Sequence, residues 1–179
     1  MKLLLDACVL YPTVMREILL GAAKAGLYTP LWSDRILEEW ARAARKLGAE
    51  GEVQARAEVA LARASFPHAS VQPPASLAAR LYLPDENDVH VLAAAIHGSA
   101  DGIVTQNAKD FPRNILAEEG LTRRDADGLL WEFASHAPDT MAQVVEQVRQ
   151  EAERLSGAQW PTRRLLKKAR LPRLAKALG

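Results

Sequence analysis

The sequence predicts an α/β fold, a three-layer α/β/α sandwich in which helices cover both faces of a central parallel sheet. Short apolar runs alternate along the chain with longer segments whose apolar residues recur at helical spacing. The first run, "KLLL", holds three consecutive leucines, as a strand buried on both faces does. Polar residues directly follow two of the apolar runs, at Asp6 and at residues 105–107. The carboxyl ends of parallel strands are where such folds form their sites.

The first elements are set by an apolar run and two helix signals. The strand at Leu3–Leu5 ends at Asp6. Pro12 suits the first turn of a helix, and apolar residues then recur at helical spacing until Gly26 ends it. Residues 27–33, "LYTPLWS", predict a short second strand.

Two more helices and a weak strand are expected next. Ser33 is a suitable N-cap for the amphipathic segment that stops at Gly48. A third helix is expected from Val53 to Ala64. Residues 68–73, "HASVQP", are a weak candidate for a third strand, because the segment is short and flanked by prolines.

The second half of the chain continues the alternation of strands and helices. Pro84 and Asp85 open an apolar helix that Gly98 ends. Residues 101–107, "DGIVTQN", predict a fourth strand, and residues 120–134 a short strand followed by a helix. Pro138 begins a helix that reaches about Leu155, and a small linker then leads to a basic helix.

The C-terminal segment is strongly basic. From Gly157 onward the chain has seven basic residues and no acidic one, while the net charge of the whole chain is +1. Residues 1–156 therefore carry a net charge of about −6. This arm can contact a polyanion such as RNA, or it can be a solvated amphipathic helix whose leucines pack on the body. The candidate RNA-binding residues are Arg163, Arg164, Lys167, Lys168 and Arg170.

Composition narrows the class of protein. Of the 179 residues, 49% are hydrophobic and 25% are charged, which is ordinary for a globular protein. Cys8 is the only cysteine, so neither an internal disulfide nor a cysteine zinc cluster is possible. No apolar run is long enough to span a membrane, and the N-terminus lacks the order of a secretory signal. A cytoplasmic location is expected.

Four acidic residues stand beside apolar elements and are candidates for a metal site: Asp6, Glu39, Asp88 and Asp110. Gathered carboxylates repel one another unless a cation neutralises them, and oxygen ligands without His or Cys suit Mg²⁺ or Mn²⁺. Such an ion can promote phosphodiester hydrolysis. Each residue also has a local interpretation: Asp6 can end a strand, Glu39 can pair with Arg42, Asp85 can be an N-cap and Asp110 can form a turn.

Three stretches, "LLLDACVL", "SDRILEEW" and "LPDENDVHVLAAAIHGSADGIVTQNAKDFP", resemble the PIN domain family, which is known for metal-dependent ribonucleases. The resemblance covers residues 2–135. It implies a PIN-like nuclease domain over residues 1–136 and a C-terminal helical extension with a basic tail over residues 137–179. It maps the family's first three carboxylates onto Asp6, Glu39 (with Glu38 as the less favoured choice) and Asp88.

The fourth position of the family pattern differs. Many PIN domains have an aspartate two residues after the threonine, whereas this chain has Asn107 after Thr105. Asn107 can still offer a carbonyl oxygen to a metal, and Asp110 can supply the missing negative charge. Thr105 would orient a carboxylate or a water. Asp85, at the same helix start as Asp88, is expected to support the site, and the number of ions stays open.

The resemblance also implies a biological setting. Bacterial PIN proteins of about this size are often VapC-type toxins, ribonucleases that a partner antitoxin holds inactive, and they often form homodimers. We therefore expect an endoribonuclease, the toxin of a toxin–antitoxin pair. The alternatives are a catalytically weakened RNA-binding or scaffold module, because of Asn107, and a phosphatase with Asp6 as nucleophile. The phosphatase is disfavoured because the second aspartate it needs is replaced by Cys8. Neither His90 nor Cys8 is expected to take part in the chemistry.

Overall fold

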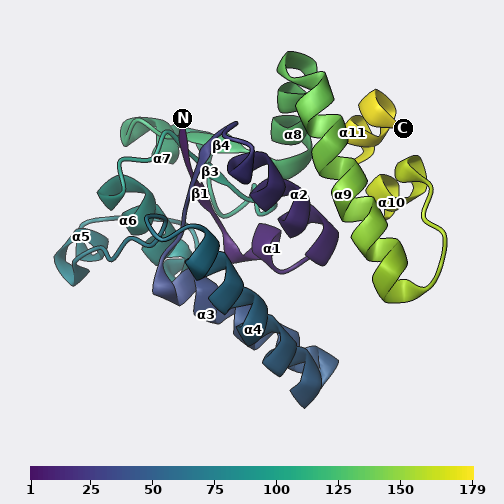
Figure 1. Cartoon of the computed structure of the whole chain (residues 1–179). Helices are drawn as coiled ribbons and strands as arrows, with labels where there is room; N and C mark the ends of the chain where they lie inside the picture. The colour runs from purple at the N-terminus through teal and green to yellow at the C-terminus, as the bar shows by residue number, and fades with distance from the viewer. The chain divides into compact units, whose positions relative to one another are not determined.

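The computed structural model describes residues 1–179, which divide into two compact units. The first unit consists of Met1–Tyr11 and Thr29–Arg124. The second consists of Pro12–Tyr28 and Asp125–Gly179. Figure 1 labels the helices and strands of both units. The domain boundary expected between residues 136 and 137 stays a prediction.

The first unit contains one sheet of four parallel strands, in the order β2-β1-β3-β4. The strands are β1 (Lys2–Leu5), β2 (Thr29–Leu31), β3 (Gly102–Val104) and β4 (Thr122–Arg124). Strand β1 is central, with a strand paired on each side, and Leu3, Leu4 and Leu5 are almost completely buried although they point alternately to the two faces of the sheet. The parallel sheet confirms the expected PIN-like α/β class.

A glycine is required where β3 meets β4. Gly102 pairs with Leu3 on one side and with Thr122 on the other. A Cβ atom at residue 102 would lie 2.6 Å from Thr122 Oγ1 and 2.8 Å from the Thr122 carbonyl oxygen. Any larger residue would therefore push β3, which leads into Thr105, away from β4.

The helices of the first unit include those that carry the acidic residues. Ser33 caps α3 by accepting a hydrogen bond from the Ile36 backbone N–H at 3.2 Å, as expected from the sequence. Helix α6 packs on the two central strands, β1 and β3. The helices are α1 (Ala7–Leu10), α3 (Asp34–Ala43), the 3-10 helix η1 (Ala44–Leu47), α4 (Ala49–Ser65), α5 (Ala75–Ala79), the 3-10 helix η2 (Glu86–Asp88), α6 (Val89–His97) and α7 (Arg113–Glu118).

Several expectations for this unit were wrong or incomplete. Residues 68–73 form no strand, and only an isolated bridge pairs Trp32 with Ser70. Helix α4 starts at Ala49 rather than at Val53. The short helices α1, α5 and α7 were not expected, because four to six residues are too few to show a helical period.

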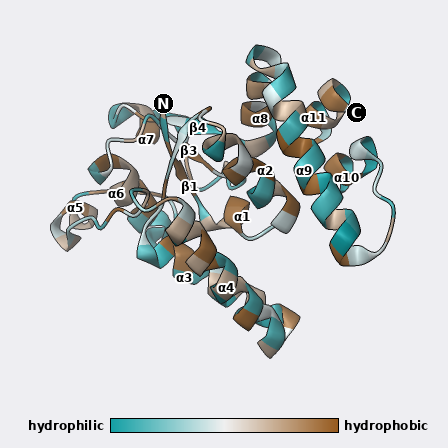
Figure 2. Ribbon diagram, viewed as in Figure 1, coloured by the Kyte–Doolittle hydropathy of each residue, from teal (hydrophilic) through white to brown (hydrophobic).

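The second unit is entirely helical. It consists of α2 (Thr13–Lys24), α8 (Ala126–His136), α9 (Pro138–Ser156), α10 (Thr162–Lys168) and α11 (Pro172–Leu178). Helix α9 shows both hydrophilic and hydrophobic ribbon segments in Figure 2, and it buries Met141, Val144 and Val145. It lies so close to α2 that a Cβ on Gly21 would be 2.7 Å from Val144 Cγ1.

The basic C-terminal segment forms two helices instead of one. Arg170, between α10 and α11, has a positive φ of 62°, and Pro172 begins α11. A proline has no N–H to continue the first helix, so the break falls before it. No helix of the chain is both long enough and apolar enough to cross a membrane.

Candidate metal centre

Two neighbouring strand ends bring Asp6 and Thr105 together. Each residue lies one position past its strand, and each continues the sheet: the Asp6 N–H donates to the Val104 carbonyl at 3.1 Å, and the Thr105 N–H to the Arg124 carbonyl at 3.0 Å. The Thr105 hydroxyl then donates to Asp6 Oδ2 at 2.8 Å. Asp6 is 6% and Thr105 2% exposed. The parallel pairing of β1 and β3 therefore builds this contact between residues 99 positions apart.

Both carboxylate oxygens of Asp6 have donors. Oδ1 accepts from the Ala7 N–H at 2.8 Å, so Asp6 caps α1, and the Cys8 thiol donates to Oδ2 at 3.3 Å. Burial raises the pKa of Asp6 above its usual value, although these hydrogen bonds and the one from Thr105 lower it. Glu39 adds a smaller rise through its negative charge. The local interpretation of Asp6 as the end of a strand is confirmed, and Asp6 also caps α1, while its role in a metal site stays a prediction.

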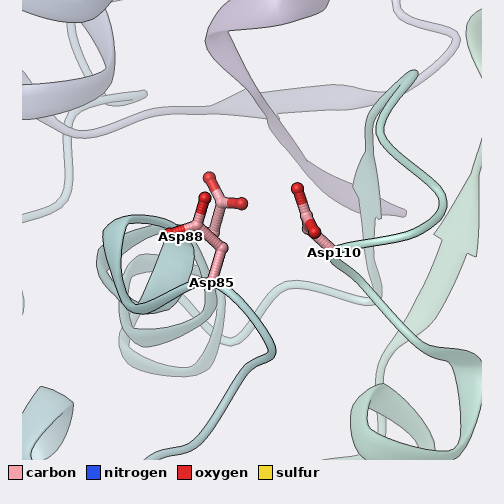
Figure 3. Close-up of side chains that lie close together, drawn as sticks. All are labelled: Asp85, Asp88 and Asp110. Carbon is pink, nitrogen blue, oxygen red and sulfur yellow. The ribbon is translucent and has the colours of Figure 1, made fainter.

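Three aspartates gather beside the start of α6. One carboxylate oxygen from each of Asp85, Asp88 and Asp110 lies within 4.8 Å of the others. Figure 3 shows Asp85 and Asp88 on one side of the cluster, at the helix start, and Asp110 facing them from the loop after β3. Asp85 also caps η2 by accepting from the Asn87 N–H at 2.9 Å. Oxygen ligands in this arrangement fit a hard divalent cation.

Asn107 positions Asp110 within this cluster. Its side-chain amide donates to Asp110 Oδ2 at 2.7 Å, and its backbone N–H donates to Thr105 Oγ1 at 3.0 Å. Asn107 is therefore linked to the aspartate cluster by the hydrogen bond from its side-chain nitrogen to Asp110. The role of Asn107 as a metal ligand through its carbonyl oxygen stays a prediction.

Asp88 is the group that most needs a cation. Its Oδ2 atom is buried and has no hydrogen-bond partner. Burial, and then the negative charges of Asp6, Asp85, Asp110 and Glu39, together raise the pKa of Asp88 to about 6. A buried carboxylate oxygen without a donor costs free energy unless a proton or a metal ion meets it. The donor set therefore fits a divalent metal ion.

Glu38 and Glu39 face different surroundings. Glu38 forms ion pairs with Arg42 and Arg56 at 2.9 Å, and their hydrogen bonds lower its pKa to about 2. Glu39 lies 2.6 Å from His90 Nε2 through its Oε1, and its charge acts on both Asp6 and Asp88. The alternative interpretation, in which Glu39 pairs with Arg42, is wrong, since Arg42 pairs with Glu38 and Glu39 pairs with Arg35 at 3.6 Å. Of the two, Glu39 is the one that faces the acidic residues.

The sequence of this chain matches a known protein family. A sequence model of the PIN domain matches residues 2–109. This chain belongs to the PIN domain family. No curated protein and no solved structure gives a significant match. PIN domains are generally metal-dependent nucleases, and PIN nucleases act on RNA. The matched range includes Asp6, Glu39 and Asp88, and ends one residue before Asp110.

Two residues of this PIN domain were not expected at the site. Cys8 contacts Asp6, lies 3.4 Å from Thr105 Oγ1 and accepts from the Gln106 N–H at 3.3 Å. Burial and then the charge of Asp6 raise the pKa of the Cys8 thiol to about 11, so it stays protonated as a donor. The sequence signal for Cys8 was its position two residues after Asp6, on the turn that begins α1.

His90 is the second unexpected residue. Its side chain is 11% exposed, its Nδ1 has no partner, and its Nε2 is close to Glu39 but not aligned for a hydrogen bond. Its place two residues after Asp88 on an apolar helix gave no signal, because a histidine there is typical of an ordinary helix face. The contact with Glu39 arises only from the packing of distant segments.

Removing the Thr105 hydroxyl is expected to destabilise the PIN domain. In Thr105→Val, Asp6 loses its buried donor and the Asn107 N–H loses its acceptor, at a cost of about 1–3 kcal/mol in the free energy of unfolding. Urea unfolding in the presence of EDTA measures this loss without a contribution from metal. Thr105→Ser keeps the hydroxyl and should retain most of the stability. Equal stability of the valine and serine variants would contradict this role.

Proposed function

We propose that this PIN domain is an endoribonuclease that hydrolyses RNA phosphodiester bonds with Mg²⁺ or Mn²⁺. The observation that supports it most directly is the buried, unpartnered Oδ2 of Asp88 beside Asp85 and Asp110. Ordinary structural carboxylates acquire hydrogen bonds when they are buried. Asp6, one residue past the carboxyl end of β1, also raises the pKa of Asp88 through its charge, and the carboxyl ends of parallel strands are the usual place of a site.

The chain offers a defined set of groups to the ion. We assign Asp6, Glu39, Asp88 and Asp110 as its ligands and as the catalytic carboxylates, with Asn107 as a further candidate. When bound, a divalent ion can polarise a phosphoryl oxygen and lower the pKa of an attacking water. Thr105 holds Asp6 in place, and Asn107 holds Asp110. Asp85 adds negative charge and fixes the turn that presents Asp88.

The toxin role is a further part of this proposal and rests on the sequence resemblance to VapC-type proteins. It implies a partner antitoxin, a cytoplasmic location and the possibility of a homodimer. Induced expression in a bacterial host is expected to arrest growth. The Asp6→Asn variant, expressed to the same level, should not. Growth arrest by both proteins would separate toxicity from the acidic site.

The experiment that tests the nuclease is a titration of Mg²⁺ and Mn²⁺ with a panel of fluorescent RNAs. The wild-type chain is expected to cleave at least one RNA, to lose cleavage in EDTA and to regain it with either ion. Asp6→Asn should stay inactive at every metal concentration. Cleavage that persists in EDTA would overturn the metal assignment.

One outcome of the same titration would favour the weakened RNA-binding module instead. Metal binding without cleavage of any RNA is what that module predicts, because Asn107 is neutral where many PIN domains have an aspartate. Asn107→Asp would then be expected to create metal-dependent cleavage. A wild-type chain that cleaves makes this alternative unnecessary.

A further inference from the structure

The second unit presents cations on one side of its last two helices. We call the exposed basic side chains of α10, α11 and the segment between them the C-terminal basic face. The other side of these helices buries Leu165, Leu166 and Leu174, and α11 packs on α8 and α10. The basic face consists of Arg163, Arg164, Lys167, Lys168, Arg170, Arg173 and Lys176.

The charges of this face are not neutralised within the unit. None of its seven side chains forms an ion pair with an acidic residue. Three of the four acidic residues of the neighbouring helix α9 already have partners within that helix: Arg149 pairs with Glu146 at 2.7 Å and with Glu153, and Arg154 pairs with Glu151 at 2.5 Å. The fourth, Asp139, lies in the first turn of α9 and forms no ion pair with the basic face. An uncompensated group of cations on a fixed surface attracts a polyanion.

The face is held in place by specific hydrogen bonds. The buried carboxylate of Asp127 on α8 accepts from the backbone N–H groups of Arg173 at 2.9 Å and Leu174 at 3.0 Å, at the start of α11. The Trp160 N–H, just before α10, donates to Glu153 on α9 at 3.1 Å. The cations therefore project from an ordered surface rather than from a loose tail.

Aromatic rings lie among the cations. Lys168 Nζ lies 4.8 Å and the Arg164 guanidinium 5.5 Å from the Trp160 ring centre, and the Arg173 guanidinium lies 4.5 Å from the centre of Trp131. Trp131 is 41% exposed. Trp160 is half-buried, so Trp131 is the ring open to a ligand. Cations beside an exposed aromatic ring match single-stranded nucleic acid, whose phosphates bind the cations and whose bases stack on the ring.

We propose that the C-terminal basic face binds single-stranded RNA through its phosphates, with Trp131 as a stacking surface for a base. The choice of RNA rests on the proposed ribonuclease function. The binding itself needs neither the metal nor the acidic residues of the first unit. Its failure can therefore be distinguished from a failure of the nuclease proposal.

The test measures binding of a fluorescein-labelled single-stranded RNA by anisotropy over a series of salt concentrations. The full chain carries Asp6→Asn and the buffer contains EDTA, so that no RNA is cut. Arg163→Gln/Lys167→Gln removes two exposed cations that do not stack on Trp160. We expect roughly tenfold weaker binding and a salt slope reduced by about 1.4, the value for two lost contacts with a single strand.

The matched control, Lys2→Gln/Lys24→Gln, removes the same charge from exposed lysines outside the face. Its affinity and salt slope should equal those of the parent protein. Equal effects of the two double variants, with unchanged unfolding temperatures, would overturn the proposal, because net charge alone would then explain the binding. Trp131→Leu should weaken the binding of single-stranded RNA more than that of an RNA duplex.

Two further probes exclude other partners. Duplex RNA that binds as tightly as the single strand, with no effect of Trp131→Leu, would overturn the stacking assignment. Vesicles with anionic lipid that bind the protein while single-stranded RNA does not would overturn the proposal as a whole. If RNA binding follows the expected pattern but the wild-type chain cleaves no RNA, the proposal that this face binds RNA is supported. Only the proposed nuclease function is then contradicted.

Discussion

Asp88→Asn is expected to lower the rate of RNA cleavage by a factor on the order of a hundred or more, while the folded structure remains intact. Asp88 is the acidic residue with a buried, unpartnered carboxylate oxygen, and Asp6, Asp85, Asp110 and Glu39 all act on its pKa. Its replacement removes the charge from the centre of the candidate metal site. The stabilisation that a bound metal ion gives a transition state is several kcal/mol, and each 1.4 kcal/mol is about a factor of ten in rate.

A matched control lies two residues away. Glu86 is an exposed carboxylate on the same short helix, η2, and lies outside the cluster. Glu86→Gln is expected to keep the wild-type cleavage rate. Single-turnover cleavage at saturating metal, with circular dichroism as a check of folding, measures both variants. An Asp88→Asn protein that is folded and cleaves at the wild-type rate would remove Asp88 from the site.

The same substitution is expected to stabilise the metal-free protein. The folded-state pKa of Asp88 is about 6, against 3.8 for the free side chain. The folded state therefore binds the proton more tightly, so the free energy of unfolding falls as the pH rises from about 4 through 6 and stays low above that. At neutral pH, Asp88→Asn should raise the free energy of unfolding by about 1 kcal/mol, after the shift is reduced for solvent screening.

Metal removal should reverse the order of stability. Divalent ions stabilise the wild-type fold by mass action, by about 2.7 kcal/mol at a hundred times the dissociation constant. Asp88→Asn should gain much less. Thermal unfolding at neutral pH, with EDTA and then with Mn²⁺, makes both comparisons with Glu86→Gln as the control. A wild-type protein whose unfolding temperature rises no more with Mn²⁺ than that of Asp88→Asn would contradict the metal site.

Local sequence patterns were sufficient to predict the strands and helices that are long or buried. Three leucines before Asp6 predicted β1, Ser33 predicted the start of α3, and the apolar segment after Asp85 predicted α6. These features depend on neighbours within one strand or one turn of helix, so the chain carries their signals locally. The short helices α1 and α7 carried no such signal, because their length hides the helical period.

Part of the candidate site could likewise be predicted from the sequence, and part required the structure. The positions of Asp6 and Thr105 after two buried strands were visible in the sequence, because a parallel sheet places the carboxyl ends of its strands at one edge. The sequence predicted that Asn107 offers a carbonyl oxygen and that Asp110 supplies the missing negative charge, and it left the number of ions open. In the structure, Asp110 joins Asp85 and Asp88, and Asn107 holds Asp110 by a hydrogen bond.

The amino-acid sequence was thus enough to find the family, the parallel sheet and the carboxylates that follow its strands. The packing of distant segments was needed to give Glu38 its second arginine partner and Glu39 its acidic neighbours, to bring His90 against Glu39 and to leave Asp88 Oδ2 buried without a donor. The physical reason is that these contacts join residues far apart in the sequence. A carboxylate's burial and charge neighbours depend on which helices and loops lie around it, and no local pattern in the chain encodes that arrangement.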